Sequence, residues 1–485
     1  MSTPWNVVWF KRDLRLQDHA PLATAVDADL PVLLVYILET SLLQDENHSE
    51  RHTRFILESI ADLNRQLQEQ GTQIQVFHAE AQEVFTWLQQ QFGLHTVFSH
   101  EETGLRITYD RDVSLATWFR EQGVVWNEFQ SNGVERGRSN RQDWSKRWHI
   151  AMNEPVSEVN WDGASWVDIN LSFPGKPLPE TTPRPAAMQP GGETTAHRYM
   201  QSFLYERGTF YSKHISKPEQ SRQSCSRLSP YLAWGNLSIR QVYQAYKQAR
   251  TEVSHKKPLA AFATRLRWHC HFIQKFEMED RMEFEPYNSG YNLLEKTFNP
   301  EWFEAWKTGT TGYPLVDACM RAVNETGYLN FRMRAMVVSF WTHHLWQPWK
   351  PGAIWLAQQF LDFEPGIHYA QFHMQAGATG INTIRIYNPV KQAQDHDPDG
   401  SFVHRWVPEL SALEPPYLCE PWKLPPLEQE RIGFRLGEHY PHPIIDIKES
   451  GQYARKRLWS HRNHRAVRAE SKRILQRHTM PNRQP

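Results

Sequence analysis

The chain has 485 residues, enough for two or three domains with substantial cores. It carries 54 Lys and Arg against 54 Asp and Glu, so its bulk charge gives no indication of nucleic-acid binding. Its four cysteines lie far apart without a CxxC pair, which excludes a disulfide framework and a zinc site of that type and indicates a reducing compartment. No signal-peptide pattern follows Met1, and no window holds the ~18 apolar residues of a membrane span. We therefore expect a cytoplasmic protein that does not contact a membrane.

Positive charge gathers at the C-terminal end of the chain. Residues 453–485 hold ten Lys and Arg against one Glu. A solvated helix face is the default interpretation of this pattern, and contact with phosphates is the alternative.

The first part of the chain alternates short apolar runs with amphipathic stretches. The composition of buried strands occurs in residues 6–10 (NVVWF), 31–36 (PVLLVY), 74–77 (IQVF) and 95–98 (HTVF). Residues 54–67 place apolar side chains at helical spacing. Strands separated by helices indicate a parallel sheet with helices on both faces, which is a Rossmann-like α/β domain over residues 1–135. No GxGxxG motif follows the first strand, so the ligand of this domain is not specified.

A segment rich in Pro, Gly and Thr follows this domain. Residues 172–192 (SFPGKPLPETTPRPAAMQPGG) have linker composition, and we assign residues 136–192 to an interdomain linker. Beyond it the strand pattern disappears. Helical periodicity continues in residues 194–204, 239–249, 260–276, 315–324 and 331–345. We predict an all-α domain over residues 193–485.

A hydroxyl-rich segment in this second domain precedes an apolar helical run. Residues 224–232 (SCSRLSPYL) place Ser226 and Ser229 beside the free N–H groups of a helix start. Such a start suits a phosphate or pyrophosphate, but an ordinary helix N-cap explains the same residues.

Charged residues recur further along the helical part. Asn330 and Arg334 are four residues apart and share a helix face. Asp362, Glu364 and His368 follow in a segment that is otherwise aromatic and glycine-rich. An Arg334–Asp362 pair is either a scaffold for a polar ligand or a structural salt bridge. Two carboxylates and one His lack the HExxH spacing of a divalent-metal site, so no metal site is predicted.

Several motifs resemble those of the DNA photolyase/cryptochrome family. They follow the family order through most of the chain, in residues 9–16 (WFKRDLRL), 18–22 (DHAPL), 191–196 (GGETTA), 226–232 (SRLSPYL), 309–321 (GTTGYPLVDACMR), 386–389 (IYNP), 397–400 (DPDG) and 405–410 (RWVPEL). The resemblance implies an N-terminal α/β antenna domain and an all-α domain that binds FAD in a U shape. It also implies a light-harvesting chromophore in the antenna domain, which would be folate, deazaflavin or flavin.

By this resemblance, one loop cradles the FAD phosphates with Tyr211 nearby. The loop consists of Cys225, Ser226, Arg227, Leu228 and Ser229. Arg334 and Asp362 match the family's ion pair beside the isoalloxazine, and Glu364 replaces the usual Asp that accepts from ring N3–H. His368 falls where photolyases carry an Asn that faces flavin N5. It is therefore a catalytic candidate, expected to decide which protonation state of the reduced flavin is stable.

The substrate side departs from the family pattern. Trp268 matches a substrate-facing Trp of the cyclobutane-dimer enzymes. Arg265, however, stands where those enzymes have a Glu, and His269 replaces an Arg; both are expected to contact the cofactor. Phe331 takes the place of a substrate-side Asn, although Asn330 is adjacent. We assign catalytic roles to Trp268 and Asn330.

The family's electron-relay tryptophans are incomplete in this sequence. Trp349 matches the middle one, while Phe372 and Lys296 stand at the proximal and distal positions. Tyr369 is expected to join Trp349 in electron transfer. Further aromatic residues that could supply a bypass are Trp341, Trp346 and Trp355.

Two functions remain open. The first is a light-driven photolyase, in which reduced FAD donates an electron to a flipped-out pyrimidine dimer in UV-damaged DNA. The second is a cryptochrome-type blue-light receptor without DNA chemistry. The short basic C-terminal end favours repair, whereas the missing Glu and Asn favour sensing or a variant lesion chemistry. We expect a monomer in either case.

Overall fold

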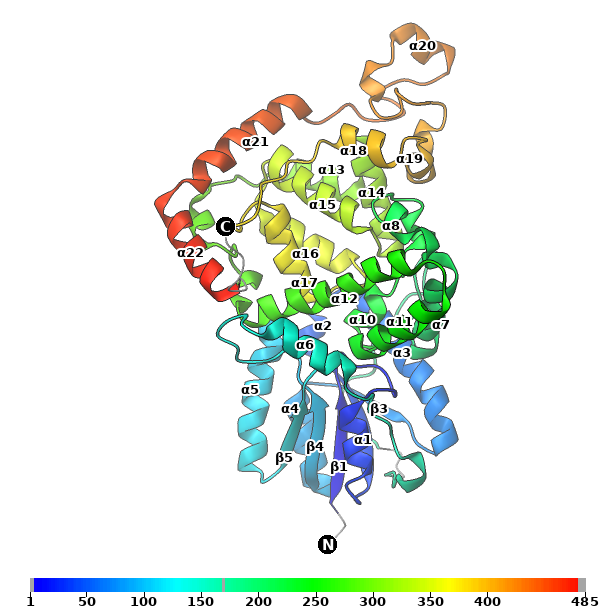
Figure 1. Cartoon of the computed structure of the whole chain (residues 1–485), viewed down its shortest axis with the longest axis vertical. Coiled ribbons are helices and arrows are strands. Elements are labelled where there is room, and N and C mark those ends of the chain that lie inside the picture. Colours follow the sequence, from blue (N-terminus) through cyan, green and yellow to red (C-terminus); the bar gives the residue numbers. More distant parts are fainter. Residues whose placement is uncertain (1–3, 168–170, 479–485) are drawn as a thin grey trace.

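The computed structural model describes residues 4–167 and 171–478. The N-terminal domain is built on a sheet of five parallel strands in the order β3-β2-β1-β4-β5 (Figure 1). The strands are β1 (Trp5–Phe10), β2 (Val32–Leu38), β3 (Ile74–His78), β4 (Leu94–His100) and β5 (Val125–Phe129). The predicted parallel α/β domain is therefore confirmed. No apolar run marks β5 in the sequence, because its side chains are largely exposed at the edge of the sheet.

Helices cover both faces of this sheet, and β1 shows why. Alternate side chains of a strand point to opposite faces. Val8 and Phe10 accordingly pack in the core that contains α3 (Glu50–Leu67), while Val7 and Trp9 pack in the core on the other face. The other helices of this domain are α1 (Ala20–Val26), α2 (Thr40–Leu43), α4 (Ala81–Phe92) and α5 (Arg106–Glu121).

The segment that follows the sheet is packed in its first part and irregular in its second. α6 (Trp144–Asn153) lies within the predicted linker and buries Trp144, Trp148 and Met152. It packs against α11 (Ile239–Glu252) of the helical domain. Residues 171–192, rich in Pro and Gly, hold no helix or strand.

The rest of the described chain is helical, as the periodicity predicts (Figure 1). The bounds of the longer helices are α7 (Glu193–Tyr205), α12 (Lys256–Glu277), α13 (Pro300–Thr308), α14 (Pro314–Thr326), α15 (Phe331–Ser339), α16 (Trp349–Gln359), α17 (Pro365–Gln375), α18 (Pro389–His396), α21 (Ile447–Arg462) and α22 (Arg465–His478). Shorter helices are α8 (Tyr211–His214), α9 (Ser221–Ser224), α10 (Ser229–Ala233), α19 (Ser401–Trp406) and α20 (Pro426–Arg431). The core of this domain is rich in aromatic side chains, among them Trp306, Trp341 and Trp406.

One predicted helix, residues 331–345, is not a single α-helix. α15 ends at Ser339, and Phe340–His344 forms a π-helical turn in which the amide of Leu345 donates to the carbonyl of Phe340. Trp346 then takes a positive φ of 51°, which ends the helix. Such turns are common at functional sites and are not visible in apolar periodicity.

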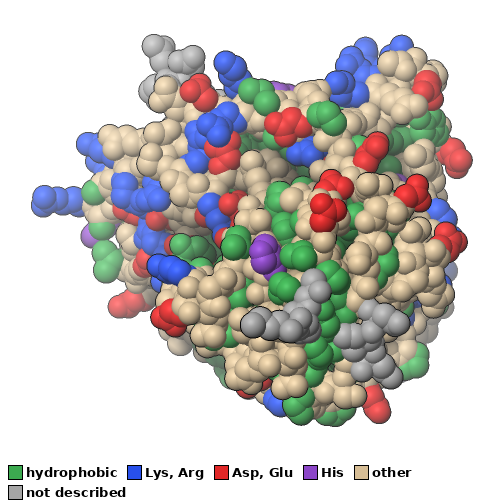
Figure 2. Space-filling view, turned by 90° about the horizontal axis from the view of Figure 1, so that it is seen from below, with side chains coloured by type: hydrophobic (Ala, Val, Ile, Leu, Met, Phe, Trp, Pro, Cys, Tyr) green, Lys and Arg blue, Asp and Glu red, His purple; other side chains and the backbone are tan. Residues whose placement is uncertain are grey.

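Charge is unevenly spread over the surface. Seen from the side of the sheet domain, Lys and Arg side chains lie mainly toward the left and upper edges, and few of them occupy the centre of this face (Figure 2). Part of the basic C-terminal end is used internally, because Arg473 of α22 pairs with both Glu279 and Glu470. Within the described segments, no helix combines the length and the apolarity that crossing a membrane requires.

Candidate functional site

Arg334 and Asp362 form an ion pair between α15 and the segment that precedes α17. Nη2 of Arg334 lies 2.9 Å from Oδ1 and 2.7 Å from Oδ2 of Asp362. Nε of Arg334 donates to the carbonyl of Leu329 at 2.8 Å, and its guanidinium lies 3.9 Å from the ring centroid of Phe360. The side chain of Asp362 is 7% exposed and that of Arg334 is 26% exposed. The predicted pair therefore exists, at the edge of a buried region.

Three residues linked to this pair by contact or by sequence each have a buried polar atom without a hydrogen-bond partner. These atoms are Nδ1 of His269, Oδ1 of Asn330 and Oε1 of Glu364. Burial lowers the pKa of His269 to about 4, although the charge of Asp362 acts in the opposite direction. A buried polar group without a partner costs about 1–3 kcal/mol. Their gathering indicates that a polar ligand completes the site.

Glu364 faces a residue of the sheet domain. Its Oε2 lies 3.6 Å from Nη2 of Arg12, which also donates to the carbonyl of Phe363. Burial raises the pKa of Glu364 to about 7, and the charge of Arg12 opposes that rise. Nε of Arg12 donates to the carbonyl of Ala233 at 3.1 Å. Sequence reasoning did not single out Arg12, although it lies in the WFKRDLRL motif directly after β1.

His368 sits one helical turn into α17, enclosed by aromatic rings. Its Nε2 donates to the carbonyl of Ala353 at 2.8 Å, which leaves Nδ1 as an acceptor in the neutral imidazole. Phe363 and Tyr369 are its nearest ring neighbours, at 5.3 and 5.4 Å between centroids. Burial lowers the pKa of His368 to about 4. The side chain is therefore a neutral acceptor at physiological pH.

The loop from Cys225 to Ser229 is held by an arginine and by its own backbone. Arg207 donates to the carbonyls of Cys225 and Ser226. Arg227 has a φ of 59°, and its guanidinium lies 3.8 Å from the ring centroid of Tyr328. The amide of Leu228 donates to Oγ of Ser226 at 3.4 Å, and Ser229 begins α10. The loop is thus a shaped turn in front of a short helix.

Tyr211 and Arg265 meet beside this loop. Arg265 lies close enough to Tyr211 for its charge to act on the hydroxyl, and burial raises the pKa of that tyrosine. The charge of Arg265 opposes the rise, and the Cys225 thiol lies close enough to act on it. The structure therefore brings together Arg265, Tyr211 and the loop, as a cofactor role for all three requires.

Two aromatic side chains of the predicted substrate side face solvent. Trp268 on α12 is 44% exposed, and Phe331 at the start of α15 is 45% exposed. Asn330 instead turns inward, where Nδ2 donates to the carbonyl of Ile215 at 3.0 Å. Asn330 is 5% exposed. The structure therefore does not bring Asn330 to the outer face with Trp268, because the helix start at Phe331 sends neighbouring side chains in different directions.

The predicted relay residues lie in contact with one another. The ring centroids of Trp349 and Tyr369 are 6.3 Å apart, and those of Trp349 and His373 are 4.4 Å apart. The Tyr369 hydroxyl donates to Oδ1 of Asn47 in the sheet domain at 2.7 Å. Lys296 instead packs against Trp346, with its Nζ 4.4 Å from the centroid of that ring. His368, Tyr369 and Trp349 therefore form a series of neighbouring rings.

A cluster of potential metal ligands lies outside this site. His19 and His100 both donate to Oδ2 of Asp13, at 3.0 and 2.7 Å. Nδ1 of His19 accepts from the amide of Leu22, so its Nε2 must carry the proton. In this arrangement one carboxylate oxygen of Asp13 accepts from both imidazoles. The cluster therefore fixes the loop after β1 through hydrogen bonds.

Comparison with known proteins gives the chain a family. One family model, described as DNA photolyase, matches residues 6–136, and another, described as the FAD binding domain of DNA photolyase, matches residues 262–460. The chain belongs to the DNA photolyase/cryptochrome family. This photolyase-family chain resembles a Cryptochrome DASH of Gloeobacter violaceus, which is 29% identical over 97% of the chain and 99% of that protein.

Relatives that are named photolyases have a similar sequence identity to the chain. A deoxyribodipyrimidine photo-lyase of Halobacterium salinarum is 27% identical over 91% of the chain and 96% of that protein. The fold of this photolyase-family chain matches a bacterial class III photolyase from Agrobacterium tumefaciens with a TM-score of 0.85 at 24% identity, covering 96% of the chain and 99% of the other. An archaeal photolyase from Sulfolobus tokodaii with two FAD molecules gives 0.77 at 23% identity, covering 94% and 100%.

FAD, the cofactor of the family domain, fits the donor set of the helical domain. The isoalloxazine ring carries donors and acceptors that would satisfy the unpaired atoms of His269, Asn330 and Glu364. The turn at Cys225–Ser229 would hold the phosphates through its backbone amides. These assignments rest on the chemistry of the residues present.

A second chromophore does not fit the cavity at the carboxyl ends of the strands. That cavity holds about 90 Å³, whereas sites for molecules of this size hold about 300 Å³ or more. The guanidinium of Arg12 lies 4.4 Å from the ring centroid of Trp234, and that of Arg111 lies 4.8 Å from Trp9. A folate, deazaflavin or flavin would have to displace both arginines.

Proposed function

We propose that this family member is an FAD-dependent, blue-light-driven photolyase that splits UV-induced pyrimidine dimers in DNA. FAD, when bound and reduced, would supply the electron that opens the dimer. The observation that carries the proposal is the exposure of Trp268 on α12, next to His269 with its unpaired buried nitrogen. A base flipped out of DNA stacks on aromatic side chains of this kind.

Each residue of the site would have a separate task. Arg334 and Asp362 would hold the ring edge, and Glu364 would accept from ring N3–H or donate to the ring when it is protonated. His368 would face N5 with its acceptor nitrogen. Trp268 would hold the damaged bases against the mouth of the pocket. We place the flavin domain in residues 193–485 and the antenna domain in residues 1–135.

A cationic groove supports DNA as the partner. Arg332, Arg385 and Arg455 line a groove of about 600 Å³ with Tyr387 and Trp459. Among the described residues that line it, none is acidic. Trp459 is 46% exposed, and Nε of Arg332 is buried without a partner. Arginines beside exposed aromatic rings suit phosphates and stacked bases.

A photoreceptor without repair activity is the second candidate. Two observations favour it. Arg265 lies beside Tyr211 where dimer-repairing enzymes have a carboxylate. The exposed Phe331 offers no hydrogen bond to a substrate. With Arg265 and Phe331 on the substrate side, the protein would still bind flavin and respond to blue light without performing repair.

Repair of a synthetic lesion distinguishes the two functions. The purified protein with bound FAD is mixed with oligonucleotides that carry one cyclobutane dimer, single- or double-stranded, and illuminated with blue light. We expect light-dependent restoration of intact pyrimidines and its loss in Trp268→Ala. No restoration with either strand form, by a protein that still photoreduces its flavin, would favour the photoreceptor. Size exclusion of the same sample is expected to give a monomer.

A further inference from the structure

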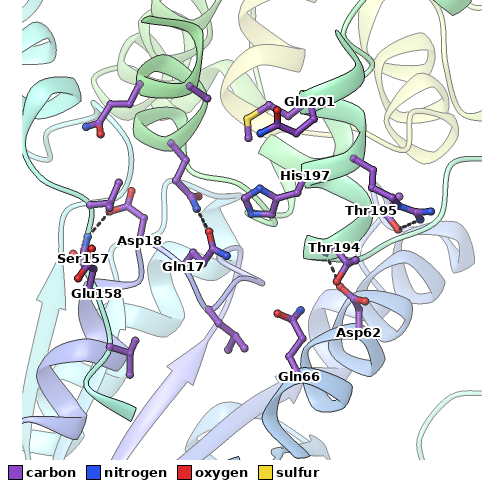
Figure 3. Close-up of a pocket in the computed structure, with 18 of the residues that line it drawn as sticks. Gln17, Asp18, Asp62, Gln66, Ser157, Glu158, Thr194, Thr195, His197 and Gln201 are labelled. Carbon is purple, nitrogen blue, oxygen red and sulfur yellow. Dashed lines mark hydrogen bonds between the residues drawn. The ribbon is translucent and has the colours of Figure 1, made fainter. Parts of the chain in front are cut away.

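A large cavity lies between the two domains, away from the flavin site. It holds about 1470 Å³. Its walls come from the loop after β1, from α3, from α7 and α11, and from the segment around residues 156–161 (Figure 3). Ligand sites occur preferentially at domain interfaces, and this volume exceeds what a small molecule needs. No residue assigned to the flavin site lines it.

Amide side chains dominate the walls. His197 and Gln17 lie near the middle of the view, Gln66 rises from α3 below them, and Gln201 lies above (Figure 3). Further amides on α11 belong to Gln241, Gln244 and Gln248. Glutamine amides pair with heterocycles that present a donor and an acceptor side by side, as in the recognition of adenine.

Two nitrogen atoms in these walls lack partners. They are Nε2 of His197 and Nε2 of Gln66, both buried from solvent. Neighbouring groups are already satisfied, since Nε2 of Gln241 donates to Oε1 of Gln17 at 3.5 Å and Nε2 of Gln244 donates to two backbone carbonyls. A ligand that enters the cavity would give each nitrogen a partner once its side chain turns toward it.

The charges of the cavity disfavour an anion. Asp18 accepts from Arg240 and Ser238, and Asp62 accepts from Arg65 and from the amide of Thr194. These carboxylates are used within the protein. Acidic Glu69 and Glu158 also line the cavity, against the cations Arg65 and Arg198. Burial lowers the pKa of His197, which keeps its imidazole neutral.

Apolar surface is available for the faces of a flat molecule. Leu16, Val159, Trp161, Met200 and Ala245 line the cavity among the amides. We propose that this cleft binds a neutral planar heterocycle with a nucleobase-like edge of donors and acceptors, between the wall of His197 and the wall of Gln66. The proposal goes beyond light-driven repair and does not depend on it.

Binding of defined probes to the FAD-loaded protein tests this site, because FAD keeps the flavin pocket filled. Equilibrium dialysis is carried out with riboflavin, adenosine and flavin mononucleotide. We expect saturable binding of riboflavin or adenosine at one molecule per chain. We expect flavin mononucleotide to bind at least about tenfold more weakly than riboflavin, because its phosphate meets the acidic lining.

Variants locate the probe. His197→Leu and Gln66→Leu are each expected to weaken binding by about tenfold, the effect of losing one or two hydrogen bonds. His197→Gln keeps a donor and should retain most of the affinity. Gln122→Leu, at an exposed position of the sheet domain, is the matched control. Unchanged FAD content and melting temperature show that each variant is folded.

Three results would overturn the proposal. One is the absence of saturable binding for both neutral probes. Another is binding that His197→Leu and Gln66→Leu both leave unchanged. The third is a flavin mononucleotide affinity equal to that of riboflavin, which would mean that the site accepts anions.

Discussion

One nitrogen of Arg334, Nη2, donates to both carboxylate oxygens of Asp362, at 2.9 and 2.7 Å. The two residues are 28 positions apart and belong to different elements, so their contact fixes α15 against the start of α17. The remaining nitrogen contact of Arg334 is to the carbonyl of Leu329. Asp362 is thus the partner that neutralises this guanidinium.

Asp362→Ala is expected to lower the FAD content of the purified protein at least about tenfold, which corresponds to about 1.4 kcal/mol. Removing one member of a buried pair leaves the other charge uncompensated. The measurement is the ratio of flavin to protein absorbance after desalting. Asp395→Ala, at an exposed position of α18, is the control. Wild-type flavin content in Asp362→Ala would mean that the pocket lies elsewhere.

His368 is expected to act as a constant acceptor over the physiological range. Because burial lowers its pKa to about 4, the flavin spectrum after illumination should be flat from pH 5.5 to 8.5 and change only as the pH approaches 4. His368→Asn offers an amide donor in place of the imidazole acceptor, so its spectra should differ from wild type at every pH. His404→Asn, another histidine bonded to a carbonyl, serves as the control.

A spectral transition near neutral pH that disappears in His368→Asn would contradict this expectation. It would mean that the bound flavin restores the ordinary titration of the imidazole.

Trp349 is expected to matter more for flavin photoreduction than the hydroxyl of Tyr369. That hydroxyl donates to the amide oxygen of Asn47, which cannot take up a proton when the phenol is oxidised. Trp349→Phe should slow photoreduction by about tenfold or more, and Tyr369→Phe by less. Absorbance under continuous blue light with an added reductant gives the rates. Trp459→Phe, on the surface, should be neutral; equal rates in Trp349→Phe and wild type would exclude this route.

Stability is expected to fall as the pH drops from about 6.5 to 4. Nine histidines of the described segments have pKa values that burial lowers to between about 2 and 4: His48, His100, His269, His271, His343, His344, His368, His373 and His478. Between the folded and unfolded pKa, only the unfolded chain binds the proton. Each such group then removes up to about 1.4 kcal/mol per pH unit.

Buried acids act in the opposite direction but are fewer. Burial raises the pKa of Glu193, Glu283 and Glu364 to about 7 and that of Asp317 to about 6. The contribution of these groups to the stability of the folded protein therefore decreases as the pH rises. Nine groups against four leave the histidines dominant. The urea midpoint of the FAD-loaded protein should therefore be lower at pH 5.5 than at pH 7.5. An equal or higher midpoint at pH 5.5 would contradict this balance.

Arg455→Gln is expected to reduce the salt dependence of DNA binding. If this side chain neutralises one phosphate, the slope of log affinity against log salt should become shallower by about 0.9 for duplex DNA or about 0.7 for a single strand. Fluorescence anisotropy at several salt concentrations measures it. Arg431→Gln is the control, because Arg431 pairs with Glu428 on α20. An unchanged slope in Arg455→Gln would remove this groove from the DNA interface.

The sequence by itself determined the parallel sheet, the helical domain and the family. Apolar runs of strand length and helical spacing are local signals, and the family motifs are contiguous. It also predicted Arg334 and Asp362 as a pair, since both are charged residues in otherwise apolar segments. The sequence did not predict β5 or the π turn at Phe340–His344, because exposed strands and single-turn irregularities have no apolar pattern.

The tertiary structure alone decided how the candidate residues are used. Arg12 reaches Glu364 across 352 positions, and Tyr369 reaches Asn47 across 322, in both cases between domains. Asn330 turns inward although its neighbour Phe331 is exposed. Burial and the direction of a side chain depend on residues far away in the chain. These pairs, the pKa shifts and the cleft between the domains therefore emerge only in the folded tertiary structure.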